Sequence, residues 1–383
     1  MTDWSTVSLR DVLKLDLHRI PVDPSATYPM VGVYSFGRGL FHREPIENGA
    51  TSYREFYRLR ADHVVMSQLF GWEGALALSS DQFEGHFVSP QFPTFLCDES
   101  RLDRRFLSWL MVRPAFWNDL GTRATGMGDR RRTLSPDSLF ACNIPLPPIS
   151  EQRRIVARIE ALAAKINEAR GLREKAAEEA EAFVTSFHAR LAGTRMKKLD
   201  DILRLDEDLA AVTPTDSYPQ VGVKSFGAGL FAKSAVVGSE TTYKTFNRLY
   251  EGAFVLSQVK GWEGAVAICP ADLEGWFVSP EYRTFRCVED EARPRYLASL
   301  VRTEWFWGKL ATATRGVGAR RERTRPEQFL NIEIPFPTME KQAHGERVFA
   351  QLNSLRMVQA ETATELDSLL PSILDRIFRE HSI

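Results

Sequence analysis

Short apolar runs bounded by Gly or Asp recur in two stretches of the chain. The runs at 31–33, 64–66 and 75–78 are rich in Val, Leu and Ala, and they predict short strands. Runs punctuated by proline at 144–147 and 334–337 predict strands at a sheet edge, because proline cannot donate a ladder hydrogen bond. These patterns predict mixed α/β modules.

A helical pattern occupies a stretch between these strands. Phe106, Leu107, Leu110 and Met111 fall on one helical face, which predicts a single helix over about 102–117.

Two much longer helical patterns follow the strand-rich stretches. Residues 151–191 contain no proline, and their apolar side chains alternate at spacings of four and three, which is the heptad pattern of a coiled coil. Such a helix would be roughly 60 Å long. The second pattern, over 339–378, is weaker because Gln359 and Thr362 occupy seam positions, and Pro371 is expected to bend or interrupt the helix. The seam residues expected to pair the helices are Ile155, Ile159, Leu162, Ile166, Leu352, Leu355, Leu366 and Leu369.

Two arrangements of these helices are open at this point. The second helix could return antiparallel along the first as a coiled coil, or each apolar stripe could pack on its own module. The helices are longer than one module can cover, which favours pairing.

The strand-rich stretches are copies of each other. Residues 28–41 read YPMVGVYSFGRGLF and residues 218–231 read YPQVGVKSFGAGLF, 190 positions further on. Residues 64–75 (VVMSQLFGWEGA) and 254–265 (FVLSQVKGWEGA) keep the same offset. A period of this length indicates a duplicated domain and not a solenoid. We therefore predict an α+β chain with four segments: a module (1–150), a helix (151–192), a second module (193–338) and a second helix (339–383).

Bulk composition narrows the class of protein. The 383 residues have a formal net charge of −1 and an ordinary globular composition. No apolar run approaches the length of a membrane span, and the first residues do not resemble a leader, so a cytoplasmic protein is expected. The four cysteines and seven histidines lack the spacing of metal ligands, so no metal site is predicted and the cysteines are expected to be small buried hydrophobes.

Catalytic signatures are missing from the sequence. Neither a phosphate-binding loop, a dinucleotide fingerprint nor a nucleophile elbow is present. Glu73 and Glu263 recur in both copies within GWEGA, and a repeated carboxylate leaves an enzyme as the less favoured alternative.

Clustered cations point to nucleic acid. Both copies place arginines after a glycine pair, GMGDRRR at 126–132 and GVGARRER at 316–323, where backbone N–H groups and guanidinium groups suit phosphate contact. The candidate phosphate contacts are Arg123, Arg130, Arg131, Arg132, Arg315, Arg320, Arg321 and Arg323. Further candidate DNA contacts are Arg43, Arg58, Lys233 and Arg248.

Other positions are candidates for reading bases. Gln68 and Gln258 recur in both copies, and glutamine can pair with adenine through two hydrogen bonds. Positions that differ between the copies are where two modules would read different bases. These pairs are Tyr34 with Lys224, Arg38 with Ala228, Phe70 with Lys260, and His86 with Trp276.

The module-to-helix junctions resemble the specificity (S) subunit of type I restriction–modification enzymes. Residues 126–160 (GMGDRRRTLSPDSLFACNIPLPPISEQRRIVARIE) are similar to the family's junction between target recognition domain and spacer helix. The second junction, 316–348, is weaker because Lys341-Gln342 replaces Glu151-Gln152, and LLPSILDRIF at 369–378 resembles the family's closing helix.

The resemblance implies a non-catalytic DNA-recognition subunit of a phage-defence complex. Each domain would read half of a bipartite duplex site, and the paired helices would set the gap and dock two methyltransferase (modification) subunits. S-adenosylmethionine, ATP and Mg would be bound by these and by the restriction/translocase subunits, with no cofactor in this chain. Two like domains related by a pseudo-two-fold axis predict a near-palindromic target. A scaffold of another methylation-linked defence system is the alternative, and a purely structural coiled coil would leave the repeated arginines unexplained.

Overall fold

The computed structural model describes residues 4–47, 50–125, 132–314 and 323–379. By contacts the chain divides into two compact units, Met1–Arg170 with Thr362–Ile383, and Gly171–Glu361. Each unit contains one module and one end of each long helix, so the units do not coincide with the four predicted segments. They are called unit 1 and unit 2 below, and each is described separately.

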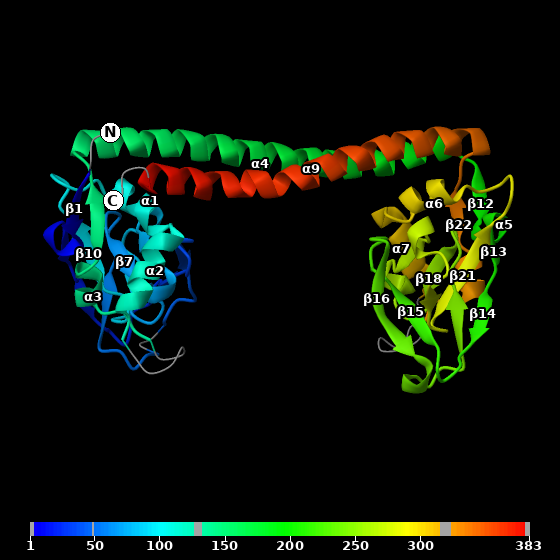
Figure 1. The fold of residues 1–383 in the computed structure, drawn as a ribbon, viewed down its shortest axis with the longest axis horizontal. Coiled ribbons are helices and arrows are strands. Elements are labelled where there is room, and N and C mark those ends of the chain that lie inside the picture. Colours follow the sequence, from blue (N-terminus) through cyan, green and yellow to red (C-terminus); the bar gives the residue numbers. More distant parts are fainter. Residues whose placement is uncertain (1–3, 48–49, 126–131, 315–322, 380–383) are drawn as a thin grey trace. The chain divides into compact units, whose positions relative to one another are not determined.

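The module of unit 1 is a mixed α/β domain (Figure 1). Its strands are β1 (Ser5–Ser8), β2 (Leu13–Leu15), β3 (Arg19–Pro21), β4 (Val31–Val33), β5 (Leu40–His42), β6 (Glu55–Arg58), β7 (Val64–Met66), β8 (Leu76–Leu78), β9 (Phe87–Val88), β10 (Thr94–Cys97) and β11 (Asn143–Leu146). They form sheets of order β2-β10-β7-β8, β3-β6-β9, β4-β5 and β1-β11. Its helices are α1 (Arg104–Met111), α2 (Pro114–Arg123) and α3 (Pro136–Phe140).

The module of unit 2 repeats this plan. Its strands are β12 (Met196–Lys198), β13 (Leu203–Leu205), β14 (Asp208–Ala211), β15 (Ser217–Val223), β16 (Leu230–Val237), β17 (Thr245–Arg248), β18 (Phe254–Ser257), β19 (Val266–Ile268), β20 (Phe277–Val278), β21 (Tyr282–Cys287) and β22 (Glu333–Pro335). The sheets are β13-β21-β18-β19, β12-β22 and the five-stranded β14-β17-β20-β15-β16. Its helices are α5 (Leu199–Ile202), α6 (Pro294–Leu300), α7 (Glu304–Thr314) and α8 (Pro326–Leu330).

The uninterrupted apolar run of β7 is explained by burial on both faces. Val64 and Met66 pack in one hydrophobic cluster, and Val65 between them packs in another. In unit 2, Phe254 and Val255 of β18 divide between two clusters in the same way. A strand between two cores needs apolar side chains on both sides, so it lacks the usual alternation.

The expected single helix over 102–117 is wrong. The segment contains α1 and α2, and the chain between them is extended at Arg113 (φ −85°, ψ 134°). Pro114 causes the break, because its ring disfavours the helical conformation at the preceding residue and suits the first position of a new helix. Asp103 caps the start of α1 by accepting the backbone N–H of Arg105 at 2.9 Å.

The long helices are α4 (Ile149–Ala192) and α9 (Met339–Arg379). α9 continues through Pro371, so the expected interruption does not occur. Leu374 and Phe378 beyond the proline are buried in the core of unit 1, and this burial offsets the backbone hydrogen bond that proline cannot make.

A buried glutamine fixes the start of each long helix to its module. Gln152 donates to the carbonyls of Arg101 and Pro147, both at 2.8 Å, and accepts the backbone N–H of Asp103 at 2.8 Å. Gln342 makes the corresponding bonds at the start of α9. The second junction, although its sequence resembles the family less, therefore keeps the glutamine that makes these hydrogen bonds.

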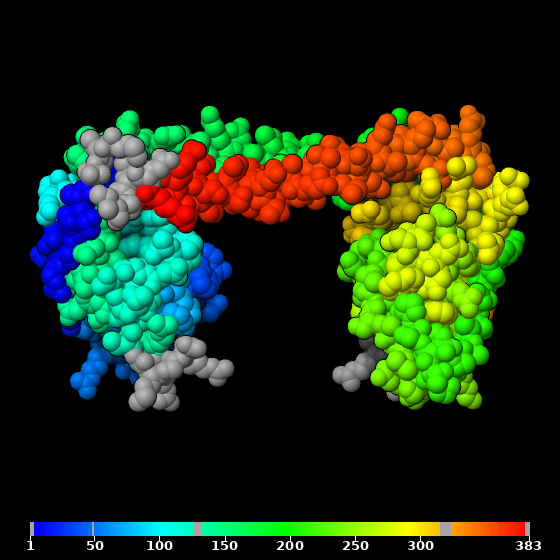
Figure 2. Space-filling model, viewed as in Figure 1, coloured from blue at the N-terminus to red at the C-terminus, as the bar shows by residue number. Residues whose placement is uncertain are grey.

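Within each unit the two helices run antiparallel. In unit 1 the end of α9 lies beside the beginning of α4, on the side of the module where α1 lies, and Arg170 contacts Asp367 at 2.8 Å (Figures 1 and 2). In unit 2, Arg356 contacts Glu181 at 2.9 Å, and the His188 and Phe349 rings stack with centroids 4.4 Å apart.

The predicted seam residues are buried to different degrees. Ile155 and Ile159 belong to the core of unit 1 together with Leu374 and Phe378, so this part of the seam both pairs the helices and packs on the module. Leu355 and Leu369 are 55% and 45% exposed. The remaining members, Leu162, Ile166, Leu352 and Leu366, are buried or partly buried.

Candidate nucleic-acid interface

Two loops that recur in both modules dock on each other. The SFG loop contains Phe36 and Gly37, and its neighbour is the GWEG turn, Gly71 to Gly74. The backbone N–H of Phe36 donates to the carbonyl of Glu73 at 2.8 Å, and that of Gly37 donates to the carbonyl of Gly74 at 2.9 Å. In unit 2 the equivalent bonds, from Phe226 and Gly227, measure 2.9 and 2.8 Å. We call this pair of loops the loop platform.

Glycine is required at the contact between the platform and the helices. Gly37 has a φ of +64°, and a Cβ there would lie 2.7 Å from the Cα of Val112. Gly227 has a φ of +59°, and its Cβ would lie 2.0 Å from the carbonyl oxygen of Val301. Backbone approaches this close exclude a side chain, which explains the repeated glycine.

The repeated carboxylates hold the loop platform together. Ser35 Oγ donates to Glu73 at 3.3 Å, and Ser225 Oγ donates to Glu263 at 2.9 Å. Within the described ranges no three His, Cys, Asp or Glu side chains gather as a metal site. These contacts give both glutamates a structural role in the loop.

Cations and aromatic rings stack on the surface beside the platform of unit 1. Tyr34 stacks on Phe41 with centroids 4.2 Å apart, and the Arg38 guanidinium lies 5.0 Å from the Tyr34 ring. Arg38 also donates to the carbonyl of Ser35 at 3.0 Å. Phe70, the residue immediately before the GWEG turn, is exposed. The platform thus brings three predicted contacts, Tyr34, Arg38 and Phe70, to two adjoining loops.

Two predicted phosphate contacts have protein partners in unit 1. Arg123 binds Asp119 through two hydrogen bonds of 3.0 and 3.2 Å. Although burial opposes it, the bonds from Arg123 and Cys142 lower the pKa of the Asp119 carboxyl. Arg132 donates to the carbonyl of Gly121 at 2.6 Å and lies 5.0 Å from the Trp72 ring. Both arginines fasten the end of α2, which the sequence interpretation did not anticipate.

The platform of unit 2 carries different side chains at the same positions. Lys224 is exposed where unit 1 has Tyr34. Lys260 is exposed on the GWEG turn and lies 3.8 Å from Glu263. Lys233 is exposed on β16 and lies 5.7 Å from the Phe231 ring. Arg323 is paired with Glu281 at 2.8 Å.

The remaining candidates lie apart from the platform or inside the protein. Arg43 and Arg58 are exposed, and Arg248 is exposed 3.8 Å from Asp208. Gln258 is buried, and its backbone carbonyl accepts the N–H of Thr324 at 2.8 Å; Gln68 does the same for Leu134. Their predicted contact with adenine stays a prediction. Arg130, Arg131, Arg315, Arg320 and Arg321 lie outside the described residues.

Phe36 and Phe226 are exposed residues of the platform that the sequence interpretation missed. Both are non-glycine residues with positive φ, 64° and 59°. The repeated Phe-Gly pair was the available signal, but the sequence alone does not show that the ring points outward.

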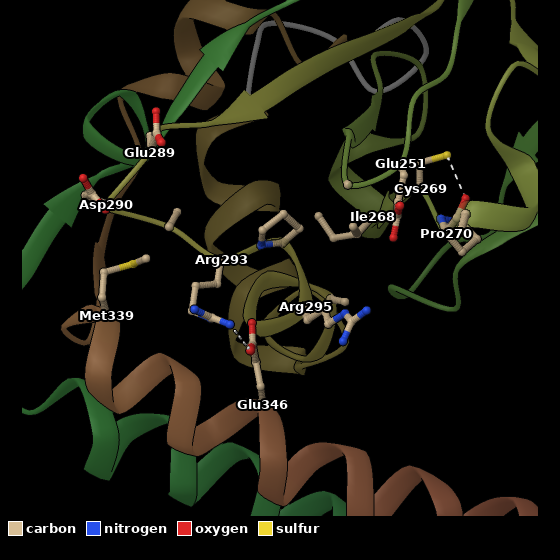
Figure 3. A pocket seen from close by; sticks show the side chains of 15 residues that line it. Glu251, Ile268, Cys269, Pro270, Glu289, Asp290, Arg293, Arg295, Met339 and Glu346 are labelled. Atoms are coloured by element: carbon tan, nitrogen blue, oxygen red, sulfur yellow. Dashed lines mark hydrogen bonds and ion pairs between the residues drawn. The ribbon is translucent and has the colours of Figure 1, made fainter.

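A cavity of about 780 Å³ in unit 2 lies between α6, β19 and the beginning of α9 (Figure 3). Arg293 reaches across it to Glu346, at 2.9 Å, and Glu289 and Asp290 line another side. The residues that line it are distinct from the platform, so the cavity is not part of the candidate interface.

Cys142 and Cys269 are buried as expected, whereas Cys97 and Cys287 are only partly buried. All four cysteines are free, and burial raises the pKa of the Cys97, Cys269 and Cys287 thiols to about 12. None of the helices in the described part of the chain combines the length and hydropathy of a membrane span.

Comparison with solved structures identifies the fold. The chain is similar to the HsdS subunit from Thermoanaerobacter tengcongensis, with 22% identity, a TM-score of 0.61, and coverage of 99% of this chain and 97% of that chain. A solved chain from work on complex assembly and conformational transition of the type I R-M system is 20% identical, with a TM-score of 0.71 and coverage of 100% and 99%. No known family model and no curated protein matches the chain. The predicted fold class, two tandem α/β modules with paired long helices, is therefore confirmed.

Proposed function

We propose that this chain is the sequence-specific DNA-recognition subunit of a cytoplasmic type I restriction–modification complex, with no catalysis of its own. Each module would read one half of a bipartite duplex site. The observation that carries the proposal is the loop platform, which recurs in both modules with exposed cations and aromatic rings on the fold of the HsdS subunit.

The side chains on the platform suit a duplex. Cations that lie over aromatic rings, such as Arg38 over Tyr34, can contact phosphates while their stems and the rings cover sugar or base edges. Paired cations such as Arg123 and Arg323 contribute less, because their carboxylate partners compete with phosphate. We therefore assign DNA contact first to Arg38 and Lys224, and we expect Lys260, which lies 3.8 Å from Glu263, to contribute less to phosphate binding.

The duplication of the module predicts the symmetry of the DNA target. Because both modules present the same loops, we propose a near-palindromic bipartite target, which is asymmetric where Tyr34 and Phe70 are replaced by Lys224 and Lys260.

The partners follow from the same proposal. Two methyltransferase subunits would dock on α4 and α9 and bind S-adenosylmethionine, and restriction/translocase subunits would bind ATP and Mg. A scaffold of another methylation-linked defence system is the remaining alternative. Affinity purification of the full chain from its own cells distinguishes the two, because a methyltransferase partner supports the first and its absence, with a different effector present, supports the second.

Methylome sequencing tests the target. Cells that express the chain with its methyltransferase should carry a bipartite methylated motif with similar inverted halves; two unrelated halves would contradict the near-palindrome. Binding of the purified complex to that duplex should weaken steeply between low and physiological salt.

A module-specific exchange tests which positions read bases. Phe70→Lys and Lys260→Phe together should change the methylated motif without altering the melting temperature, because both side chains are exposed. Leu205→Asn, at an exposed position on β13 outside the platform and the long helices, is the matched control and should leave the motif unchanged.

A further inference from the structure

An exposed phenylalanine with a left-handed backbone occupies the same place in both platforms. Phe36 is 54% exposed with a φ of 64°, and Phe226 is 60% exposed with a φ of 59°. This region of backbone space is unfavourable for a bulky side chain, and an exposed large ring gains little from burial to compensate.

Local structure fixes the backbone conformation at this position and leaves much of the ring exposed. The N–H bond to Glu73 and the approach of Gly37 to Val112 fix the turn at Phe36. The Phe36 ring contacts Trp117, with centroids 5.8 Å apart, and the Phe226 ring contacts Trp307 in the same way at 5.4 Å. Glycine or asparagine would adopt the same backbone with less strain. Despite the contact with the tryptophan, more than half of each phenylalanine side chain stays exposed and is available to a partner.

The residues around the ring differ between the modules, but the ring does not. Tyr34 and Arg38 flank Phe36, whereas Lys224 and Ala228 flank Phe226. In unit 1 the Arg38 guanidinium lies 5.9 Å from the Phe36 ring, and in unit 2 the exposed Lys224 precedes Phe226 by two positions. An exposed ring beside exposed cations matches a partner that is both anionic and partly apolar, which describes the surface of duplex DNA.

We propose that Phe36 and Phe226 pack on the sugars and base edges of duplex DNA as a contact shared by both modules, one that adds affinity without choosing the sequence. This inference rests on the proposed function. The flanking positions, 34 with 224 and 38 with 228, then discriminate between bases, while the two rings set how closely each platform approaches the groove. Identical side chains cannot distinguish the two half-sites, and a ring that packs on sugars, which every nucleotide carries, favours no base.

Asparagine substitution in the full chain tests the proposal. Phe36→Asn and Phe226→Asn keep a residue that tolerates positive φ and remove the ring. Each variant should bind duplex DNA about tenfold more weakly, on the motif and on a scrambled duplex alike, with an unchanged melting temperature. Leu172→Asn removes an apolar side chain that is 63% exposed on α4 and should bind like the wild type. Fluorescence anisotropy with labelled duplexes measures all four proteins.

The outcomes separate this inference from the proposed function. If the wild type binds and both Asn variants bind equally well, the inference is overturned and the proposed function stands. If the ratio of motif to scrambled binding changes in Phe36→Asn, the ring reads sequence and the inference is again overturned. If the wild type binds neither duplex, the proposed function falls and the inference falls with it.

A second measurement covers the case in which an Asn variant unfolds. A benzophenone amino acid in place of Phe36 or Phe226 retains the ring and should form a photo-crosslink to duplex DNA. The same amino acid at Leu172 should form none. Crosslinking at neither platform position would overturn the proposal independently of any stability effect.

Discussion

The two modules are joined to their helices at equivalent positions by different chemistry. In unit 1, Phe378 of α9 contacts Phe106 of α1, with ring centroids 5.4 Å apart. Arg113 lies 4.9 Å from the Phe378 ring and pairs with Asp375 at 3.3 Å. Unit 2 has His188 of α4 and Tyr296 of α6 at the positions that correspond to Phe378 and Phe106 at the offset of 190 residues. A hydrogen bond of 2.9 Å joins the Tyr296 hydroxyl and Nδ1 of His188.

The neighbouring side chains of the junction also differ: they are charged in unit 1 and neutral in unit 2. Thr303 and Thr185 replace Arg113 and Asp375, and together with His188 they line a cavity of about 110 Å³. The comparison teaches that the fold needs two rings at this junction, whereas an ion pair and a neutral polar pair are interchangeable around them. The junction of unit 1, with its ion pair, and the junction of unit 2, with its neutral polar side chains, should respond differently to mutation and to acid.

Truncation of Phe378 should have the largest effect. Phe378→Ala removes a fully buried ring from the core of unit 1 and should destabilise that unit by about 3–5 kcal/mol. Hydrogen exchange of α1 in unit 1, read against α6 in unit 2, measures the loss. Leu369→Ala, on the same helix but half exposed, is the control; equal effects of the two variants would contradict the role of this ring.

Acid should weaken unit 2 through His188. Burial lowers the pKa of His188 to about 3, whereas an unfolded histidine titrates near 6.5. Between these values the unfolded state binds the proton and the folded state does not, so stability is lost as pH falls from about 6.5 towards 3.

At pH 5 this loss should be about 2 kcal/mol relative to pH 8. Hydrogen exchange of α6 at the two pH values measures it, and the double variant His188→Phe with Tyr296→Phe should abolish the His188 contribution. A variant with the same acid response as the wild type would show that another group is responsible.

The next largest effect on stability is expected from loss of the ion pair between Arg113 and Asp375 in unit 1. Arg113→Met keeps much of the side-chain volume but removes the charge, and it should cost about 1–2 kcal/mol because Asp375 retains access to water. A double-mutant cycle with Asp375→Asn measures the coupling by denaturant unfolding. Strictly additive effects of the two substitutions would mean that the pair contributes nothing.

The smallest effect is expected when unit 2 is converted to the rings of unit 1. His188→Phe with Tyr296→Phe replaces both partners of a buried hydrogen bond by apolar rings and should change stability by less than about 1 kcal/mol at pH 8. The single variant His188→Phe leaves the Tyr296 hydroxyl buried without its partner, and should cost about 1–3 kcal/mol. Equal melting temperatures for the single and double variants would contradict the importance of this bond.

Most of the architecture could be predicted from the sequence, because the two copies of the module show the same pattern of strands and helices. The short strands at 31–33 and 64–66 and both long helices form as expected. The departures concern proline: Pro114 separates two helices, and Pro371, expected to bend or interrupt α9, does not interrupt it. Local rules could not distinguish them, because Leu374 and Phe378 beyond Pro371 gain their burial from residues far away in the sequence.

The candidate interface could be predicted only in part. The sequence located the SFG and GWEG loops but could not tell free cations from paired ones. The pairing of Arg123 with Asp119 was readable, since the two are four positions apart on a helix. The contacts of Arg132 with Trp72 and of Arg323 with Glu281 join distant loops, so only the folded chain shows them.

The buried end of α9 also has a consequence for the order in which the protein is made. Arg113 and its partner Asp375 are 262 positions apart, and Leu374 and Phe378 complete the core of unit 1. A ribosome delivers the chain from the amino end, so the first module emerges long before the residues that close it. Unit 2 consists of residues 171–361, so all the residues of its core are synthesised before the end of α9. The module synthesised first is therefore the one completed last.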